Sequence, residues 1–225
     1  MTHFNIITIF PKVFKEYFNT SIIGRAKKAG LIDIKIHDLR DFTNDKRKTV
    51  DDRPFGGGPG MVLKVAPIYK ALRFIEKDKQ THKVLLTPKG QEFNQKKAKN
   101  FSKKNNITLI AGRYEAFDAR VNNFIDEQIS IGPYVLTGGE LPAMIIVDAV
   151  CRLVPEVIEK ASLKEETYSS RLASGKKNTE YPQYTRPEVF KYKDKTDNLK
   201  KLKVPKILLS GNHKKIREWK QRKAH

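Results

Sequence analysis

The sequence predicts an α/β domain built on a mainly parallel sheet, and two observations support this prediction. Short apolar, β-branched segments alternate along the chain with longer segments whose apolar residues recur at helical spacing. An apolar content of 39% in 225 residues is enough to form a sizeable core. No stretch of 18 or more apolar residues occurs, so we expect no membrane-spanning helix.

The expected elements alternate between strand and helix. Strands are expected at 4–10, 32–37, 83–87, 107–111 and 126–131. Helices are expected at 13–28, 65–77, 92–104, 141–154 and 213–223. Residues 41–60 and 156–187 lack a period, which predicts a long loop and a linker, and long loops often carry function.

Glycine-containing loops are expected at the ends of several strands. Thr87-Pro88-Lys89-Gly90 and Gly112-Arg113-Tyr114-Glu115 each follow a predicted strand, and Gly138-Gly139 precedes a helix with Pro142 in its first turn. Ligands of parallel sheets bind at the carboxyl ends of strands. A pocket of exposed backbone groups suits the hydrogen bonding of adenine and ribose, although Gly138-Gly139 also fits an ordinary helix start.

The string FGGGPGM at 55–61 is the most glycine-rich part of the chain. It is not followed by Gly-Lys-Ser/Thr and lacks the GxGxxG spacing, which argues against nucleotide hydrolysis and against NAD chemistry. The remaining interpretations are a backbone that approaches a ligand closely and a flexible loop tip.

The chain is strongly basic. It has 45 Lys and Arg against 25 Asp and Glu, a formal net charge of +20. Residues 156–225 hold 19 of these basic residues and 9 of the acidic ones, so basic density is highest in the last third. This excess predicts a nucleic-acid partner whose phosphates contact that part of the chain, the alternative being a merely solvated surface.

Cysteine and histidine usage excludes several chemistries. The single Cys151 lies in an apolar run, so no intrachain disulfide is possible and no cysteine adduct is expected. The five histidines lack metal-ligand spacing to one another or to Cys151, so no metal site is predicted. The N-terminus lacks a signal-peptide pattern, and we expect a cytoplasmic protein.

Seven strings run in order along nearly the whole chain: DDRPFGGGPGM (51–61), LTPKG (86–90), GRYEAFDAR (112–120), SIGPYVLTGGELPAM (130–144), DAVCRLVP (148–155), YPQYTRPEV (181–189) and LLSGNHKKIREW (208–219). Together they closely resemble the TrmD family of tRNA (guanine-N(1))-methyltransferases, within the SPOUT superfamily. Each string alone would be weak, but seven in order are specific.

The resemblance implies an α/β fold with a deep C-terminal trefoil knot whose loops wrap S-adenosylmethionine. It divides the chain into a knotted cofactor-binding domain at 1–155, a flexible linker at 156–187 and a short, basic, helical tRNA-binding region at 188–225. The cofactor residues that it implies are Leu85, Leu86, Thr87, Pro88, Gly112, Tyr114, Glu115, Ile131, Gly132, Tyr134, Leu136, Gly138, Gly139 and Pro142.

The implied reaction moves a methyl group to N(1) of the guanosine immediately 3′ of the tRNA anticodon (tRNA position 37). The resemblance assigns Arg152 to charge on the 6-oxo oxygen and Glu166 to the N(1) proton, with Glu165 as the one-residue alternative. It also implies a homodimer whose active site is shared between protomers, and a magnesium requirement. The implied substrate-binding residues are Asp51, Arg53, Gly57, Gly58, Pro59, Gly60, Thr167, Tyr168 and Arg186.

The chain departs from the family pattern at several positions. Glu166 stands where the family has its catalytic Asp, and Ala116, Pro133 and Gln183 replace the usual Gly, Asp and His. The Glu166 change keeps open a non-catalytic RNA-binding relative as an alternative. A SPOUT methyltransferase acting on another RNA is opposed by YTRP and DDRPFGGGPGM, which are typical of the TrmD family rather than of the whole superfamily.

Overall fold

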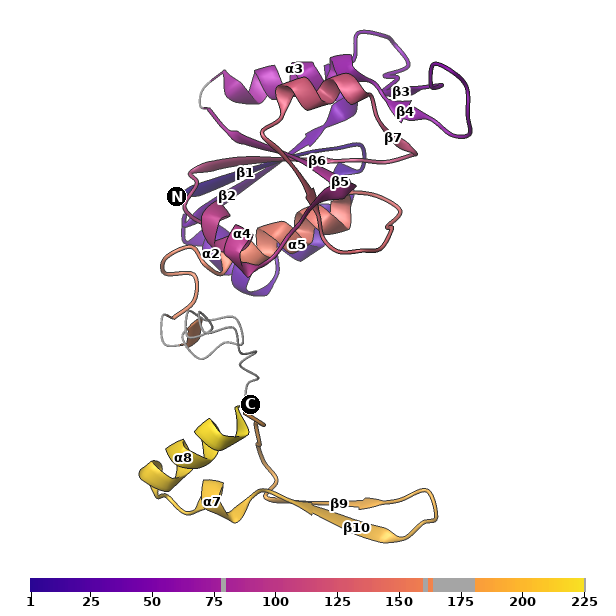
Figure 1. Ribbon diagram of the computed structural model, residues 1–225. Helices are drawn as coiled ribbons and strands as arrows, with labels where there is room; N and C mark the ends of the chain where they lie inside the picture. Colours follow the sequence, from indigo (N-terminus) through magenta and orange to yellow (C-terminus); the bar gives the residue numbers. More distant parts are fainter. Residues whose placement is uncertain (78–79, 160–161, 164–180, 225) are drawn as a thin grey trace. The chain divides into compact units, whose positions relative to one another are not determined.

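The computed structural model describes residues 1–77, 80–159, 162–163 and 181–224 (Figure 1). The chain divides into two compact units, Met1–Glu159 and Lys160–His225. The domain limits expected from the sequence, at 155 and 187, stay predictions.

A five-stranded sheet forms the centre of the first unit. Its strands β1 (Thr2–Thr8), β2 (Ile32–Asp38), β5 (His82–Glu92), β6 (Asn106–Ala111) and β8 (Glu127–Ser130) lie in the order β2-β1-β6-β5-β8. Every neighbouring pair is parallel, which confirms the predicted α/β class with a mainly parallel sheet.

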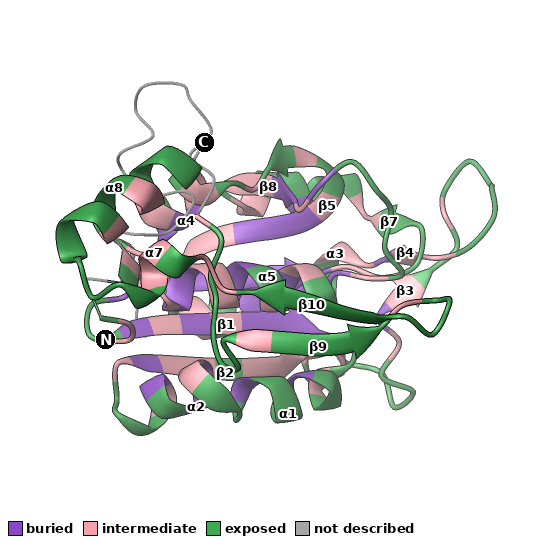
Figure 2. Cartoon of the chain, turned by 90° about the horizontal axis from the view of Figure 1, so that it is seen from below, coloured by how far each residue is buried: buried purple, intermediate pink, exposed green. Residues whose placement is uncertain are grey.

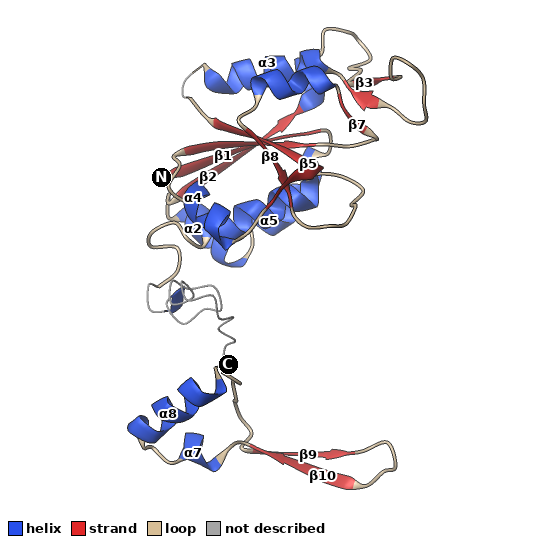
Figure 3. Cartoon of the chain, viewed as in Figure 1, coloured by secondary structure: helices blue, strands red, loops and turns tan. Residues whose placement is uncertain are grey.

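Helices cover both faces of this sheet (Figure 3). The helices α2 (Ser21–Lys28), α4 (Gln95–Phe101) and α5 (Glu140–Cys151) lie on one face, and α3 (Val65–Glu76) lies on the other. Burial on both sides explains why the strands read as nearly continuous apolar runs.

Two hydrophobic cores result from the alternation of side chains along each strand. Phe4 and Ile6 of β1 point into the core beneath α2, α4 and α5, whereas Ile7 points into the core beneath α3. The same alternation separates Leu86 from Leu85 in β5. The central strands are accordingly the most buried part of this unit (Figure 2).

The single helix predicted at 13–28 is wrong. The segment forms a 3-10 turn at η1 (Pro11–Phe14), a short α1 (Lys15–Phe18) and then α2. The break falls at Asn19 and Thr20, residue types that favour caps and turns, and Ser21 takes a left-handed φ of 52°. An added Cβ at Gly24 would lie 2.4 Å from the carbonyl oxygen of Asn19, so the broken segment packs tightly on itself.

The loop predicted at Thr87–Gly90 is instead a bulge within β5. Leu86 and Gln91 both pair with Ile129, so the residues between them leave the ladder while the strand continues to Glu92. An added Cβ at Gly90 would lie 2.4 Å from the Ile129 nitrogen, which shows how closely β5 approaches β8 here.

The other predicted elements of this unit are present, with ends that differ from the predicted ones by up to three residues. Helix α4 begins at Gln95, three residues later than the predicted start at 92, because the Asn94 side chain caps it by accepting a hydrogen bond from the Lys97 backbone. Helix α5 ends at Cys151 rather than 154, with Arg152 as its C-cap. The predicted long loop 41–60 begins within η2 (Leu39–Phe42) and contains β3 (Asp51–Asp52).

A small three-stranded sheet in the order β3-β4-β7 joins this loop to the segment after β6. Strand β4 (Val62–Leu63) pairs with β3 on one side and with β7 (Ala116–Phe117) on the other. The short η3 (Ala119–Phe124) follows β7. Elements as short as these strands carry no periodicity, so the sequence did not predict them.

The second unit contains a β-hairpin and two helices. Strands β9 (Val189–Lys193) and β10 (Leu199–Lys203) pair antiparallel, followed by α7 (Lys206–Leu209) and α8 (His213–Lys223). The basic helix α8 is confirmed at its predicted bounds, with Asn212 as its N-cap. The hairpin was not predicted. Among the described residues, no helix is long and apolar enough to cross a bilayer.

Candidate cofactor and substrate site

A cavity of about 370 Å³ lies beside the β5 bulge and the carboxyl ends of β6 and β8. Its volume falls within the range of small-molecule sites, roughly 300–1,000 Å³. The structure brings all but one of the predicted cofactor residues to its wall; these are Leu85, Leu86, Thr87, Pro88, Gly112, Tyr114, Glu115, Ile131, Tyr134, Leu136, Gly138, Gly139 and Pro142.

Gly132 is the predicted cofactor residue that does not line the cavity. It takes a φ of 151°, and an added Cβ would lie 2.5 Å from the ring of Tyr134. Gly132 therefore supports the lining Tyr134 from behind, which is a structural role that sequence spacing could not distinguish from direct contact.

Several lining residues were missed by the sequence analysis. Some are neighbours within the predicted loops, and others come from β7, η3 and β8. They are Lys89, Arg113, Ala116, Phe117, Asp118, Ala119, Asn122, Gln128, Ile129, Ser130, Val135 and Thr137. The string GRYEAFDAR contains several of these residues. The pairing of β7, which lies within this string, with β4 holds them at the cavity.

Glycines let two backbone segments meet at the base of the cavity. The Gly139 amide donates a hydrogen bond of 2.8 Å to the Gly112 carbonyl. An added Cβ at Gly139 would lie 2.6 Å from the Gly112 nitrogen and 2.7 Å from the Ala111 Cα. The neighbours are backbone atoms, which cannot rotate away, so only glycine fits at position 139.

An ion pair joins the same two segments through side chains. The Glu140 carboxylate, 4% exposed, accepts from Arg113 Nε at 2.9 Å and from the Thr8 hydroxyl at 2.8 Å. Arg113 also donates to the Thr137 carbonyl at 3.0 Å and lies over the ring of Phe10. A charge at this depth requires such partners. The pair fixes the start of α5 against the loop after β6.

Unlike Glu140, the carboxylate residues Glu115 and Asp118 line the cavity itself. Asp118 is bound by Arg120 through two hydrogen bonds, of 2.9 and 2.6 Å, which hold the pKa of its carboxyl below the usual value. Glu115 has no cation within ion-pair distance among the described residues. Glu115 therefore provides negative charge that a bound cationic ligand could neutralise.

The glycine-rich loop 55–61 reaches the cavity through Gly60. An added Cβ at Gly60 would lie 2.3 Å from the Glu115 side chain, and the Glu115 amide donates to the Met61 carbonyl at 3.2 Å. Tyr114, next to Glu115, takes a left-handed φ of 62°, a conformation that residues other than glycine adopt mainly at constrained sites. The loop and the cavity wall are thus one connected structure.

The predicted substrate residues of this loop lie at its base and along its exposed length. Asp51 is half-buried in β3, whereas Arg53, Gly57, Gly58 and Pro59 are exposed. The Arg53 amide and Lys64 hold the pKa of the neighbouring Asp52 carboxyl below its usual value, so that residue is anionic at neutral pH. Phe55 at the start of the glycine run is fully exposed.

Arg152 does not lie at the cavity of its own chain. It caps the far end of α5, whose first turn lines the cavity, so it is separated from Gly139 by twelve helical residues, or about 18 Å. The role that the resemblance gives Arg152 stays a prediction, since α5 separates this residue from the cavity of its own chain.

The other predicted catalytic and substrate residues are in different parts of the chain. Glu166, Thr167 and Tyr168, with the alternative base Glu165, lie outside the described residues. Arg186 is exposed in the second unit, just before β9.

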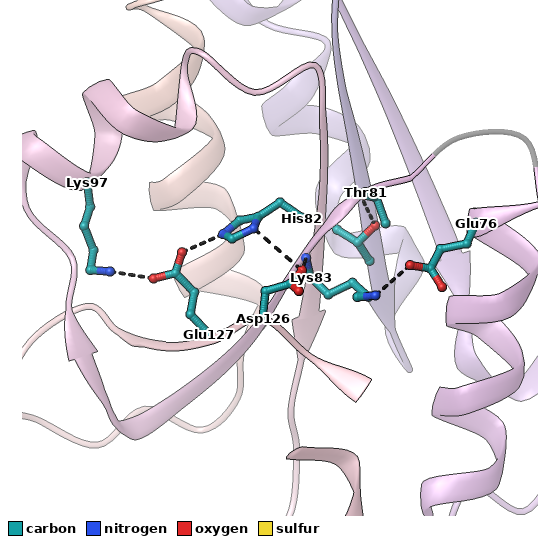
Figure 4. Close-up of polar contacts among 8 residues, drawn as sticks. Glu76, Thr81, His82, Lys83, Lys97, Asp126 and Glu127 are labelled. Atoms are coloured by element: carbon teal, nitrogen blue, oxygen red, sulfur yellow. Dashed lines mark hydrogen bonds and ion pairs between the residues drawn. The ribbon is translucent and has the colours of Figure 1, made fainter. Parts of the chain in front are cut away.

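A separate polar cluster occupies the opposite end of β5, toward the start of the strand (Figure 4). His82 contacts Glu127 at 2.6 Å and Asp126 at 3.6 Å, and Glu127 also accepts from Lys97 at 2.5 Å. Burial acts to raise the pKa of Glu127, but hydrogen bonds from Lys97 and His82 outweigh it and the pKa is lowered. This cluster ties β5 to β8 and α4. No three potential metal ligands converge anywhere in the described ranges.

Comparison with known proteins places these features in a family. Residues 2–225 match the family described as tRNA (Guanine-1)-methyltransferase TrmD. A tRNA (guanine-N(1)-)-methyltransferase of Dictyoglomus turgidum is 51% identical over 225 residues, covering 100% of this chain and 85% of that protein. Proteins of the same name from Thermosipho melanesiensis and Mycoplasmopsis synoviae are 47% and 46% identical, covering 98% and 96% of this chain and 84% and 88% of theirs. Matched along nearly its whole length, the chain belongs to the TrmD family.

Proposed function

We propose that this chain is a tRNA (guanine-N(1)-)-methyltransferase that transfers a methyl group from S-adenosylmethionine to the guanosine immediately 3′ of the anticodon, at tRNA position 37. The observation that carries the proposal is the cavity, because the loops that the family resemblance assigns to the cofactor converge on it. The net charge of +20 supports a polyanionic substrate.

The cavity fits S-adenosylmethionine in size and chemistry. Leu86, Ile131 and Leu136 offer apolar walls to the adenine ring, while the glycine segments bring backbone groups close enough for hydrogen bonds. The Glu115 carboxylate, which no cation pairs among the described residues, suits a ligand that carries positive charge. When bound, S-adenosylmethionine supplies an electrophilic methyl group on a sulfonium.

The proposed chemistry requires one base and one cation. N(1) of guanine carries a proton at neutral pH, and we assign its removal to the Glu166 carboxylate. With S-adenosylmethionine held by the cavity residues, its sulfonium would supply the methyl group to N(1), and the bonding electron pair would be left on sulfur. Negative charge develops on the 6-oxo oxygen, where the Arg152 guanidinium donates hydrogen bonds. Asp51, Arg53 and the 57–60 loop are assigned to positioning the guanosine and its neighbours.

Two observations support a homodimer with a shared active site. Arg152 lies a helix length away from its own cavity, so within the proposal it serves the partner's cavity. Helix α5 and the adjoining segment 10–17 expose several large hydrophobic side chains, which are Phe10, Val13, Tyr17, Leu141 and Ile145. Tyr17 donates to Asp148 at 2.5 Å, which joins α1 to α5 in one surface. An exposed apolar patch of this kind is typical of an interface.

The trefoil knot is part of the proposal. The tight backbone approaches of Gly139 to Gly112 and of Gly90 to Ile129 support loops that pass closely through one another. We also propose that 156–187 links the domain 1–155 to a tRNA-binding region at 188–225. Magnesium remains a proposed cofactor without an assigned ligand set.

The decisive experiment maps the product. The purified protein is incubated with labelled S-adenosylmethionine and an unmodified tRNA. This tRNA has a guanosine as the last nucleotide of the anticodon and another guanosine immediately 3′ of it. Label on N(1) of position 37 supports the proposal. Label on another atom or another RNA would favour a different SPOUT activity, and binding of tRNA without any label would favour a non-catalytic relative.

The identity of the base is tested by single-turnover rates. We expect Glu166→Gln to slow methyl transfer by about 100-fold or more while cofactor binding is unchanged, because general-base catalysis contributes roughly 10²–10⁴-fold. The matched variant Glu165→Gln should retain the wild-type rate. If the two variants exchange these outcomes, the alignment with the family motif is off by one residue and Glu165 is the base. Glu166→Asp tests whether the longer side chain limits the rate.

A further inference from the structure

The β9–β10 hairpin has two chemically different faces. The register pairs Lys191 with Lys201, Phe190 with Leu202 and Tyr192 with Lys200. Since side chains alternate along a strand, Phe190, Tyr192 and Leu202 share one face. Lys191, Lys201 and Lys203 share the other. All six are exposed (Figure 2).

The lysine face is unfavourable on its own. The Asp194 amide donates to the Asn198 carbonyl and the Val204 amide to the Glu188 carbonyl. Because hydrogen-bonded pairs alternate with non-hydrogen-bonded pairs, Lys191 and Lys201 form a non-hydrogen-bonded pair, whose side chains are the closer kind. Two like charges directly opposite each other destabilise a hairpin.

No carboxylate relieves this repulsion in the described part of the chain. Lys193 pairs with Asp197 at 2.9 Å and Lys200 with Asp194 at 3.6 Å, at the turn of the hairpin. Lys191, Lys201 and Lys203 have no such partner among the described residues. A ligand that presents several negative charges in a row would remove the repulsion.

The aromatic face points to a ligand with flat, apolar surfaces. The Phe190 and Tyr192 rings lie 6.1 Å apart with an interplanar angle of 10°. They are 53% and 38% exposed, and Leu202 beside them is 59% exposed. Parallel, exposed aromatic rings next to lysines are the surface on which unpaired nucleic-acid bases stack.

We infer that the hairpin 189–203 binds unpaired nucleotides of the tRNA substrate, with Phe190 and Tyr192 stacking on bases and Lys191, Lys201 and Lys203 contacting an adjacent stretch of phosphates. The inference rests on the proposed tRNA methyltransferase function and adds a preference for unpaired RNA. In a paired stem the bases are already stacked on each other, so the aromatic face would have no ligand there.

The test uses the full chain and measures its affinity for unmodified tRNA and for a blunt RNA duplex over a series of salt concentrations. The double variant Phe190→Leu with Tyr192→Leu keeps apolar side chains but removes both rings. It should bind tRNA at least about fivefold more weakly and the duplex as wild type does, because each stacked base contributes roughly 1–3 kcal/mol. Its salt slope should be unchanged. The ring-preserving variants Phe190→Tyr and Tyr192→Phe should retain wild-type affinity.

Substitutions on the lysine face should instead affect the binding of both RNAs and its salt dependence. Lys191→Gln with Lys201→Gln should weaken binding to both RNAs and flatten the slope of log K against log salt by about 0.7–0.9 for each phosphate that the variant no longer neutralises. Leu199→Ala, on the lysine face and 62% exposed, is the matched control and should change neither quantity.

Several outcomes would overturn the inference. Unchanged tRNA affinity in the double leucine variant excludes stacking, and an equal loss for tRNA and duplex excludes a preference for unpaired RNA. A change in the sedimentation mass of that variant, with RNA binding intact, would assign the aromatic face to another copy of the chain. If wild type methylates tRNA while any of these results is obtained, the inference fails and the proposed function stands. If wild type does not methylate tRNA, the proposed function fails.

Discussion

The Arg113 guanidinium and the Glu140 carboxylate lie 2.9 Å apart and join the loop after β6 to the first turn of α5. Glu140 is nearly fully buried, and its second oxygen accepts from Thr8 at the end of β1. Three segments that are far apart in the sequence are therefore held together at the edge of one cavity. Glu140 was not among the predicted site residues, although the string GGELP contains it.

We expect Glu140→Gln to lower both stability and cofactor affinity. Glutamine can still accept from Thr8 but leaves Arg113 without its counter-charge, and a hydrogen bond to a charged group contributes about 1.5–3 kcal/mol. Arg113 is 26% exposed, so water offsets part of this loss and we expect the lower end of that range. Urea unfolding and calorimetry with S-adenosylmethionine measure the two effects.

Arg120→Gln, which removes the more exposed pair with Asp118, is the control and should change stability by less than about 1 kcal/mol. Equal effects of the two variants would contradict the assigned role of Glu140.

Gly139→Ala should destabilise the fold and weaken cofactor binding together. The added methyl would meet backbone atoms of Ala111 and Gly112, so the loops must separate, and overpacking of this kind destabilises a protein by about 1–3 kcal/mol or more. Gly57→Ala is the control, because Gly57 has a φ of 82° with nothing within 4 Å of an added Cβ. It should lose about 1–2 kcal/mol from backbone strain alone and keep its cofactor affinity. A Gly139→Ala variant that binds the cofactor normally would show that the loops do not need this contact.

His37 makes stability depend on pH. Burial and, to a smaller extent, the charge of Lys35 lower its pKa from the ordinary 6.5, while its ring is hydrogen-bonded to the Asn5 side-chain oxygen at 3.0 Å. The unfolded chain therefore takes up a proton at higher pH than the folded one, so the free energy of unfolding decreases as pH falls below about 6.5. His37→Gln, which can still donate to Asn5, should show a smaller decrease between about pH 7.5 and about pH 5.5. His213→Gln on the exposed α8 should behave as wild type. If His37→Gln loses stability as steeply as wild type, His37 is not the source of the dependence.

The order of the main elements could be predicted because both faces of the sheet are covered. Apolar strands such as 107–111 and the amphipathic pattern of 65–77 are set by local sequence, and the structure has them at β6 and α3. The features that were predicted wrongly depend on tertiary contacts. The helix break at Asn19 and the bulge after Leu86 both lie where one backbone segment packs against another. The periodicity of apolar residues along the sequence does not reveal such contacts.

The cavity could be predicted from the glycine loops and the family strings, but its supports could not. Asp118 and Asn122 reach it only because β7 pairs with β4, a contact of two residues per strand. Arg152 was predicted from the family string DAVCRLVP, which does not show that this residue caps the end of α5 opposite Gly139. The hairpin at 189–203 was not predicted because its two strands, VFKYK and LKKLK, are rich in lysine and lack a regular alternation of apolar and polar residues.

We expect the chain to sediment as a dimer with a mass near twice 25.9 kDa. Leu141→Lys with Ile145→Lys places two charges in the exposed apolar surface of α5 and should shift the protein toward monomer, because burying an unpaired charge in an interface is strongly unfavourable. Leu209→Lys in α7, similarly exposed, is the control and should leave the mass unchanged. A monomeric wild type with full methylation activity would exclude the shared active site.

The separation of Arg152 from its own cavity leads to a complementation test. A chain with Arg152→Ala keeps an intact cavity but lacks the cation, and a chain with Leu136→Glu keeps Arg152 but has a charge in the cavity wall. Each homodimer should be inactive. Calorimetry should show that only the Leu136→Glu variant fails to bind S-adenosylmethionine, and sedimentation should show that both variants form dimers. In a mixed dimer, the intact cavity of the first chain faces Arg152 of the second, so one of the two sites is complete. Mixing the two variants should therefore restore methylation, up to about half the wild-type rate per mixed dimer. If Arg152 instead served its own cavity, neither site of the mixed dimer would be complete and mixing would restore nothing.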